Sequence, residues 1–107
     1  MRYAARRDGN DAIITEALRK AGFTVMDYGT AGQGIPDKLI SRLLPDGLQW
    51  ICWVEIKMPK GRLKTAQEAF RDVFEPRGEH YVARDAETAI RELYARYTAA
   101  IKPEQLR

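Results

Sequence analysis

The chain has 107 residues, of which 45% are hydrophobic and 31% charged, and a net charge of +3, which predicts a single globular domain over residues 1–107. No apolar stretch approaches the roughly 20 residues of a membrane span, and the first residues lack a signal-peptide core, so we expect no membrane partner. The single cysteine excludes an intrachain disulfide and suits a reducing cytoplasm, and one histidine with one cysteine excludes a zinc site of the usual His/Cys type.

The first part of the chain predicts a helix followed by a strand. Asp8 or Asn10 can cap a helix that ends near Lys20, and the apolar residues between them recur at helical spacing. Gly22 ends this helix, as glycine often does just past a helix terminus. Residues 23–28 are rich in β-forming side chains and predict a strand.

Two further strands follow, and we expect them to pair as a hairpin. A flexible glycine-containing loop spans residues 29–34, and the next strand spans residues 35–44, with Asp37 near its start. Residues 45–47, Pro-Asp-Gly, are a turn signal, and the following strand spans residues 49–57. Because this last strand is so apolar, we expect it to be central and covered on both faces.

The connection after the third strand leads into a second helix. Thr65 and Glu68 have the Thr-x-x-Glu spacing of a capping box. The helical spacing of the apolar side chains that follow predicts that they face inward; these are Phe70, Val73 and Phe74.

A short strand and a longer helix complete the chain. The strand is expected at residues 80–83, with His80 at the surface, whereas Cys52 is expected in the core. Asp85 caps a helix that ends before Pro103. The order α-β-β-β-α-β-α predicts a mixed α/β domain with helices packed on a sheet.

The end of the third strand carries the most informative group of residues. Side chains alternate along an extended strand, so Glu55 and Lys57 should lie on one face, roughly 7 Å apart. Asp37 belongs to the strand that should pair with this one, so its carboxylate and that of Glu55 could converge on one metal ion. The main-chain carbonyl of Ile56 could add a neutral oxygen ligand.

Such a group suits the hydrolysis of a phosphodiester bond. Mg²⁺ or Mn²⁺ binds a few carboxylate oxygens plus water, neutralises charge on the phosphate and activates the water. The ammonium of Lys57 could orient that water, stabilise the phosphate or, with a lowered pKa, accept a proton. The alternative is that Glu-x-Lys, a common tripeptide, is solvated charge. The apolar strand, the aspartate after the glycine-containing loop and Gln67 in the next helix favour a site.

Three pieces of the sequence together resemble the PD-(D/E)xK nuclease superfamily: Ile35-Pro36-Asp37, Val54-Glu55-Ile56-Lys57 and the downstream Gln67. The small size resembles the stand-alone VRR-NUC type found in phages, which is similar to archaeal Holliday-junction resolvases. The resemblance covers essentially the whole chain. It implies an α/β fold with a restriction-endonuclease-like αβββαβ core and a C-terminal helix packed on a mixed sheet, in a phage or bacterial cytoplasmic protein.

This resemblance also implies a role for individual residues. Asp37 and Glu55 match the metal-binding acids of the family, and Lys57 matches its catalytic lysine. Gln67 matches a polar helix residue that contacts the site or the DNA backbone. The family often adds an acid from the first helix to the metal site, and Asp11 stands in that place. The alternative for Asp11 is an acid favoured by the helix dipole.

The resemblance implies DNA as the substrate, with branched or Holliday-junction DNA favoured, and a homodimer. Basic side chains after the catalytic strand should contact phosphates; these are Lys60, Arg62 and Lys64. A second basic group near the start consists of Arg2, Arg6 and Arg7. On charge alone, a solvated surface explains these residues equally well. Two other functions stay open: a catalytically idle nucleic-acid-binding module with the same fold, and an RNA-processing or restriction-type nuclease.

Overall fold

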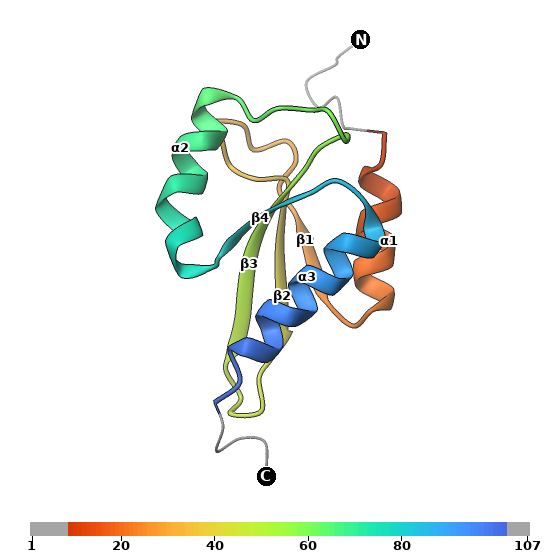
Figure 1. The fold of residues 1–107 in the computed structure, drawn as a ribbon, viewed down its shortest axis with the longest axis vertical. Coiled ribbons are helices and arrows are strands. Elements are labelled where there is room, and N and C mark those ends of the chain that lie inside the picture. The colour runs from red at the N-terminus through yellow and green to blue at the C-terminus, as the bar shows by residue number, and fades with distance from the viewer. Residues whose placement is uncertain (1–8, 103–107) are drawn as a thin grey trace.

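The computed structural model describes residues 9–102 and has a mixed α/β fold (Figure 1). The elements in chain order are α1 (Asp11–Lys20), β1 (Thr24–Asp27), β2 (Lys38–Leu43), β3 (Gln49–Ile56), α2 (Thr65–Phe74), the 3-10 helix η1 (Glu75–Arg77), β4 (His80–Ala83) and α3 (Ala86–Ala99). The predicted order of helices and strands is confirmed, and η1 is an addition to it. Within the described range, none of the helices combines the length and apolar sequence that a membrane span requires.

The four strands form one mixed sheet in the order β1-β2-β3-β4. β1 pairs antiparallel with β2, and β2 pairs antiparallel with β3, which confirms the expected hairpin. β3 and β4 run parallel, and parallel neighbours need a crossover connection, which α2 provides. β3 is therefore an inner strand with a partner on each side, as its apolar sequence predicts.

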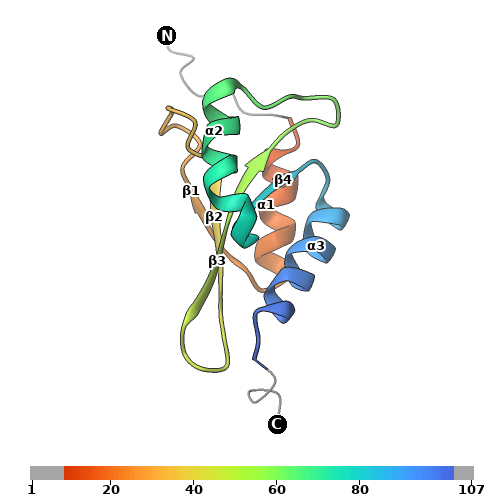
Figure 2. The same ribbon diagram turned by 60° about the vertical axis from the view of Figure 1, so that its left-hand side comes forward.

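Helices cover the two faces of the sheet unequally (Figure 2). α1 and α3 pack together on one face, where Ile14, Val54 and Leu93 are fully buried in the main apolar core. α2 lies on the other face, and its Phe70 ring contacts Trp53 edge-on at a centroid distance of 5.3 Å. β3 is thus held between a large core and a small aromatic cluster.

The strand ends nearest the candidate site differ from expectation. β2 begins at Lys38, later than predicted, because pairing with β1 starts there; Asp37 therefore lies just before the strand. β3 ends at Ile56, so Lys57 lies just after it. The expectation that β3 is covered on both faces is only partly right, since Ile51 on the α2 face is 39% exposed. The short α2 does not reach that part of the strand.

The cap of α3 is confirmed, whereas the cap of α1 is not. Asp85 accepts a hydrogen bond of 2.8 Å on its Oδ1 from the first turn of α3. Asn10 is the N-cap residue of α1, but its side chain makes no capping hydrogen bond. It donates instead to the carbonyl oxygens of Lys57 and Arg84, far along the chain. The alternative cap, Asp8, lies outside the described residues.

The start of α2 also differs from the predicted capping box. Lys64, not Thr65, is the N-cap residue, and its backbone N–H donates to Oε1 of Gln67 at 2.8 Å. Glu68 is therefore not the residue that reaches back to the cap. Val73, expected to face inward, is 66% exposed, because the two half-buried phenylalanines of the helix, four positions apart, define the side that faces the sheet.

His80 is buried, contrary to the expectation that it lies at the surface. It begins β4 beside Trp53 of β3, is only 2% exposed and packs near Phe70 of α2. Parallel pairing with the inner strand brings this residue under the helix. Burial is the main cause that lowers the pKa of the imidazole. Cys52, expected in the core, is fully buried.

The buried imidazole predicts a loss of stability in acid. Because the folded-state pKa of His80 is lowered, the unfolded chain binds the proton more readily than the folded chain. The contribution of His80 to the free energy of unfolding is therefore fully present above the pKa that the residue has in the unfolded chain, and it is lost as the pH falls below about 6.5. We expect the difference in unfolding free energy between wild type and His80→Gln to shrink from pH 8 to pH 5.5, as measured by urea denaturation. A difference that does not change with pH would contradict this.

Candidate active site

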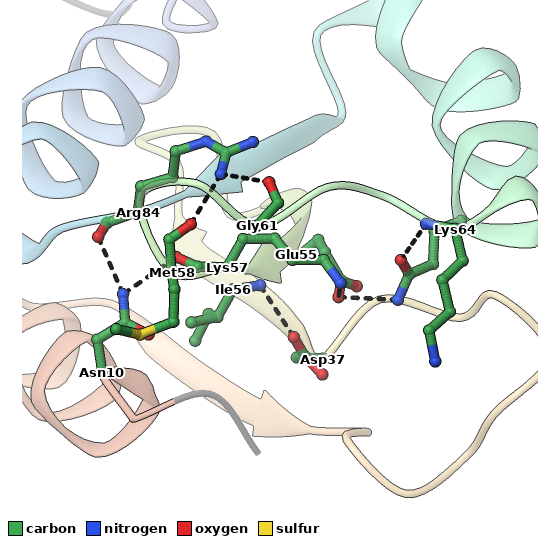
Figure 3. A network of polar contacts seen from close by, with 10 residues as sticks. Asn10, Asp37, Glu55, Ile56, Lys57, Met58, Gly61, Lys64 and Arg84 are labelled. Carbon is green, nitrogen blue, oxygen red and sulfur yellow. Dashed lines mark hydrogen bonds and ion pairs between the residues drawn. The ribbon is translucent and has the colours of Figure 1, made fainter. Parts of the chain in front are cut away.

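Asp37 and Glu55 lie opposite each other at one end of the β2–β3 hairpin. The register pairs Lys38 with Val54, so the preceding residue, Asp37, faces Glu55. Oδ2 of Asp37 accepts a hydrogen bond of 2.9 Å from the amide of Ile56, which holds the aspartate against the end of β3 (Figure 3). The two acids predicted from neighbouring strands therefore come together, although Asp37 stands just outside β2.

Glu55 is a buried carboxylate whose charge is only partly balanced by hydrogen bonds and nearby cations. The residue is 3% exposed, and its Oε2 accepts a hydrogen bond of 3.0 Å from Nε2 of Gln67 and lies 3.5 Å from Nζ of Lys57. Its Oε1 is buried and accepts no hydrogen bond within residues 9–102. Burial, and then the charge of Asp37, raise the pKa of Glu55 to about 7, against the opposing effect of Lys57. Ionised Glu55 is thus costly in the folded protein.

This pair of carboxylates fits a hard divalent cation. Mg²⁺ takes oxygen ligands and is commonly bound through one or two carboxylates, with water completing its shell. The unpartnered oxygen of Glu55 and the proximity of Asp37 leave negative charge that a cation would offset. Among the described residues, no three acidic, histidine or cysteine side chains form a metal-binding group, so the fit rests on this pair. Ile56 contributes its N–H to the site, and its carbonyl as a ligand stays a prediction.

Asp11 is not placed with these two carboxylates. It is buried in the first turn of α1, where its Oδ1 lies 3.2 Å from Nζ of Lys38 and accepts a hydrogen bond from Thr15. Lys38 is 1% exposed and also pairs with Asp27 at 3.3 Å. Strand alternation directs Lys38 to the α1 face and Asp37 to the opposite face. The ion pair therefore holds Asp11 on the α1 face of the sheet.

Gln67 connects α2 to the site with both ends of its amide. Its Oε1 accepts the hydrogen bond from Lys64 at the start of the helix, and its Nε2 donates to Glu55. A neutral amide combines an accepting oxygen with a donating NH₂ group, so one side chain can fulfil both contacts. Gln67 therefore fixes the first turn of α2 and the orientation of Glu55 together.

The predicted phosphate-binding residues are exposed on the connection between β3 and α2. Lys60, Arg62 and Lys64 all lie on this connection, which leaves the site directly after Lys57. Exposed cations can meet a phosphate backbone without the cost of burying a charge beforehand. The other basic group predicted from the sequence lies outside the described residues: Arg2, Arg6 and Arg7.

Gly34 brings the loop before Asp37 against the first turn of α2. Its φ is +83°, and a Cβ at this position would overlap the backbone carbonyl of Ala66. Gly32 has a similar φ of +74°, but a Cβ there would meet nothing within 4 Å. The two glycines therefore separate the cost of backbone conformation from the cost of a steric clash.

We expect Gly34→Ala to destabilise the fold more than Gly32→Ala. Gly32→Ala should cost about 1 to 2 kcal/mol for its left-handed backbone alone. Gly34→Ala should cost about 1 to 3 kcal/mol more, because the loop or α2 must move to relieve the overlap. Urea denaturation of the two variants measures the difference. Equal losses would show that the loop yields to the clash without cost.

No protein-family model, curated protein or solved structure matches this chain. The chemistry available to the protein therefore lies in the residues that converge at the end of β3. Those residues are two carboxylates, an amine 3.5 Å from one of them and an amide that orients the same carboxylate.

Proposed function

We propose that the protein is a divalent-metal-dependent nuclease that hydrolyses phosphodiester bonds in DNA. The observation that carries this proposal is the state of Glu55, which is buried beside Asp37 and Lys57 with one oxygen unpartnered in the described chain. If Glu55 served only the stability of the fold, a neutral side chain at this position would make the folded protein more stable. A metal-binding role explains why the acid is there.

Each residue of the site has a defined part in this proposal. Asp37 and Glu55 would hold Mg²⁺ or Mn²⁺, which when bound supplies an activated water and offsets charge on the phosphate. Lys57, next to Glu55, would orient the attacking water and stabilise charge that develops on the phosphate oxygens. Gln67 would keep Glu55 in its ligating orientation. The exposed basic connection after β3 would bind the flanking phosphates and make binding salt-sensitive.

The proposal includes membership in the PD-(D/E)xK superfamily and a preference for branched DNA. The order α1-β1-β2-β3-α2-β4, with α3 packed on the mixed sheet, is consistent with the nuclease core that the motifs suggest. A domain of this size has little surface with which to recognise a long base sequence, which favours recognition of DNA shape. A cytoplasmic homodimer, which could make two symmetric cuts, belongs to the same proposal.

The test is cleavage of four labelled DNAs: a four-way junction, a flap, a linear duplex and a single strand. We expect cutting with Mg²⁺ or Mn²⁺, none in EDTA, and loss of cutting in Lys57→Ala but not in Lys20→Ala. Lys20 is an exposed lysine at the far end of α1 and controls for loss of a surface charge. The ranking of the four substrates tests the preference for branched DNA.

The alternatives predict different results from the same assay. A catalytically idle binding module would bind DNA in a salt-sensitive way but cut nothing with any metal, and Lys57→Ala would leave its binding intact. An RNA-processing enzyme would cut RNA of matched sequence in preference to DNA. Either result would overturn the proposed DNA nuclease.

A further inference from the structure

The main chain that leaves β3 turns sharply next to the site and exposes its carbonyl oxygens. Lys57 makes the last sheet hydrogen bond, from its N–H to the carbonyl of Ala83 at 3.0 Å. The chain then forms a turn in which the N–H of Gly61 donates to the carbonyl of Met58 at 2.9 Å. The carbonyl oxygens of Met58, Pro59 and Gly61 accept further hydrogen bonds from outside the turn.

Arg84 donates these hydrogen bonds. It lies between β4 and α3, and its Nη1 donates to the carbonyls of Met58 at 2.9 Å and Gly61 at 2.7 Å (Figure 3). A longer contact of 3.3 Å joins the same Nη1 to the carbonyl of Pro59. One guanidinium nitrogen carries two hydrogens, so the two short contacts are the full hydrogen bonds. The rigid, permanently charged guanidinium thereby fixes both ends of the turn relative to each other.

Asn10 completes the arrangement from the other side. Its Nδ2 donates to the carbonyl of Lys57 at 3.1 Å and to the carbonyl of Arg84 itself at 2.9 Å (Figure 3). The backbone of Lys57 is thus held at its N–H by Ala83 and at its carbonyl by Asn10. Three segments distant in the sequence meet here: the start of α1, the end of β3 and the start of α3.

We propose that Arg84 is a positioning residue that, with Asn10, sets where Lys57 lies relative to Asp37 and Glu55. The inference rests on the proposed nuclease function. Lys57 lies beyond the end of β3, so the sheet alone does not define its place. A displacement of about 1 Å in such a group can cost about a hundredfold in rate, so a device that fixes its backbone has a catalytic consequence.

A double-mutant comparison separates this role from a general effect on the fold. We expect Arg84→Ala to lower kcat by about 10- to 100-fold with little change in KM, and Arg84→Lys to recover part of the loss. In a Lys57→Ala background, Arg84→Ala should cost at most about twofold more, because residues that act as one unit have non-additive effects. Arg91→Ala, an exposed arginine on α3, is the matched control and should leave kcat unchanged.

Two results would overturn the proposal. One is an unchanged kcat in a folded Arg84→Ala variant, and the other is an equal loss of rate in the presence and absence of Lys57. Should Arg84→Ala fail to fold, Asn10→Ala tests the same arrangement and should lower kcat by a smaller factor.

Hydrogen exchange makes the outcome independent of nuclease activity. In Arg84→Ala the amide of Gly61 should exchange faster than in wild type, while amides in the middle of β3 keep their protection. Equal exchange at Gly61 would show that Arg84 does not hold the turn and would overturn the inference directly. A wild type that cuts no substrate with any metal would instead refute the proposed function, and the exchange result would still decide whether Arg84 fixes the turn.

Discussion

Lys57→Ala should lower the rate of metal-dependent cleavage by about 10²- to 10⁴-fold without unfolding the protein. Nζ of Lys57 lies 3.5 Å from Glu55, and its side chain is only 13% exposed, so the ammonium acts in a poorly hydrated place where its charge has a large effect. Neither the carboxylates proposed to bind the metal nor the apolar core loses an atom in this variant. The loss should therefore appear in the rate of the chemical step, measured under single-turnover conditions with saturating enzyme.

Two further variants give this result its meaning. Lys57→Arg keeps the charge but changes its shape, so partial recovery would indicate charge stabilisation and no recovery would indicate a need for the compact amine. Lys20→Ala removes an exposed lysine of the same chemistry and should retain the wild-type rate. DNA affinity measured in Ca²⁺ should change little in Lys57→Ala. A cleavage rate within about threefold of wild type would remove Lys57 from the proposed mechanism.

The sequence correctly predicted the elements that are determined by interactions between residues close together in the chain. Asp85 caps α3 because its side chain needs only the N–H groups of the next turn. The Pro-Asp-Gly turn closes the hairpin because Gly47 adopts φ +89° and Oδ1 of Asp46 accepts a hydrogen bond from Leu48. Once that hairpin is in place, strand register alone brings Asp37 opposite Glu55. This is why the centre of the candidate site could be predicted.

Residues whose partners are far away in the sequence could not be predicted in the same way. Asn10 has the chemistry of a helix cap, but its side chain is used 47 residues away at Lys57 and 74 residues away at Arg84. Nothing local distinguishes these two uses. Lys38 carried a weak signal, since it stands two residues before the apolar Ile40 and therefore shares its core face by alternation, where a charge needs a partner.

The pairing of a strand also decides burial that composition leaves open. His80 begins a four-residue strand whose other residues, Tyr-Val-Ala, do not alternate between polar and apolar. The sequence of the strand therefore does not show which of its faces is buried. Parallel pairing with β3 places His80 beside Trp53 and beneath α2. Asp11 shows the same limit, because its position at the edge of the apolar stripe of α1 allowed either a metal-binding role or an acid favoured by the helix dipole. In the structure its partner is the buried Lys38, which no local feature of α1 indicates.

Glu55→Gln should abolish cleavage and at the same time stabilise the protein at neutral and alkaline pH. Loss of a metal ligand removes several kcal/mol of charge stabilisation, which corresponds to a rate loss of about 10³-fold or more. The folded-state pKa of Glu55 is raised from 4.5 to about 7, so between these values the folded protein binds a proton that the unfolded chain releases. The contribution of Glu55 to the free energy of unfolding is fully present below pH 4.5 and is lost as the pH rises through about 7.

The stabilisation at pH 8 should therefore be about 1 to 3 kcal/mol and should decrease towards zero near pH 4.5. Guanidine denaturation of wild type and Glu55→Gln across this range measures it, and Glu16→Gln, a change of an exposed acid on α1, serves as the control with little effect.

Added Mg²⁺ or Mn²⁺ should raise the melting temperature of wild type at pH 8 but not that of Glu55→Gln, because only the folded protein with both acids binds the ion. A variant that is less stable than wild type at pH 8, or a metal effect equal in both proteins, would argue against Glu55 as a metal ligand. The combination expected here, a gain in stability with a loss of activity and of metal response, is what distinguishes a functional acid from a structural one. Replacing a structural acid would instead lower the free energy of unfolding at every pH at which that acid is ionised.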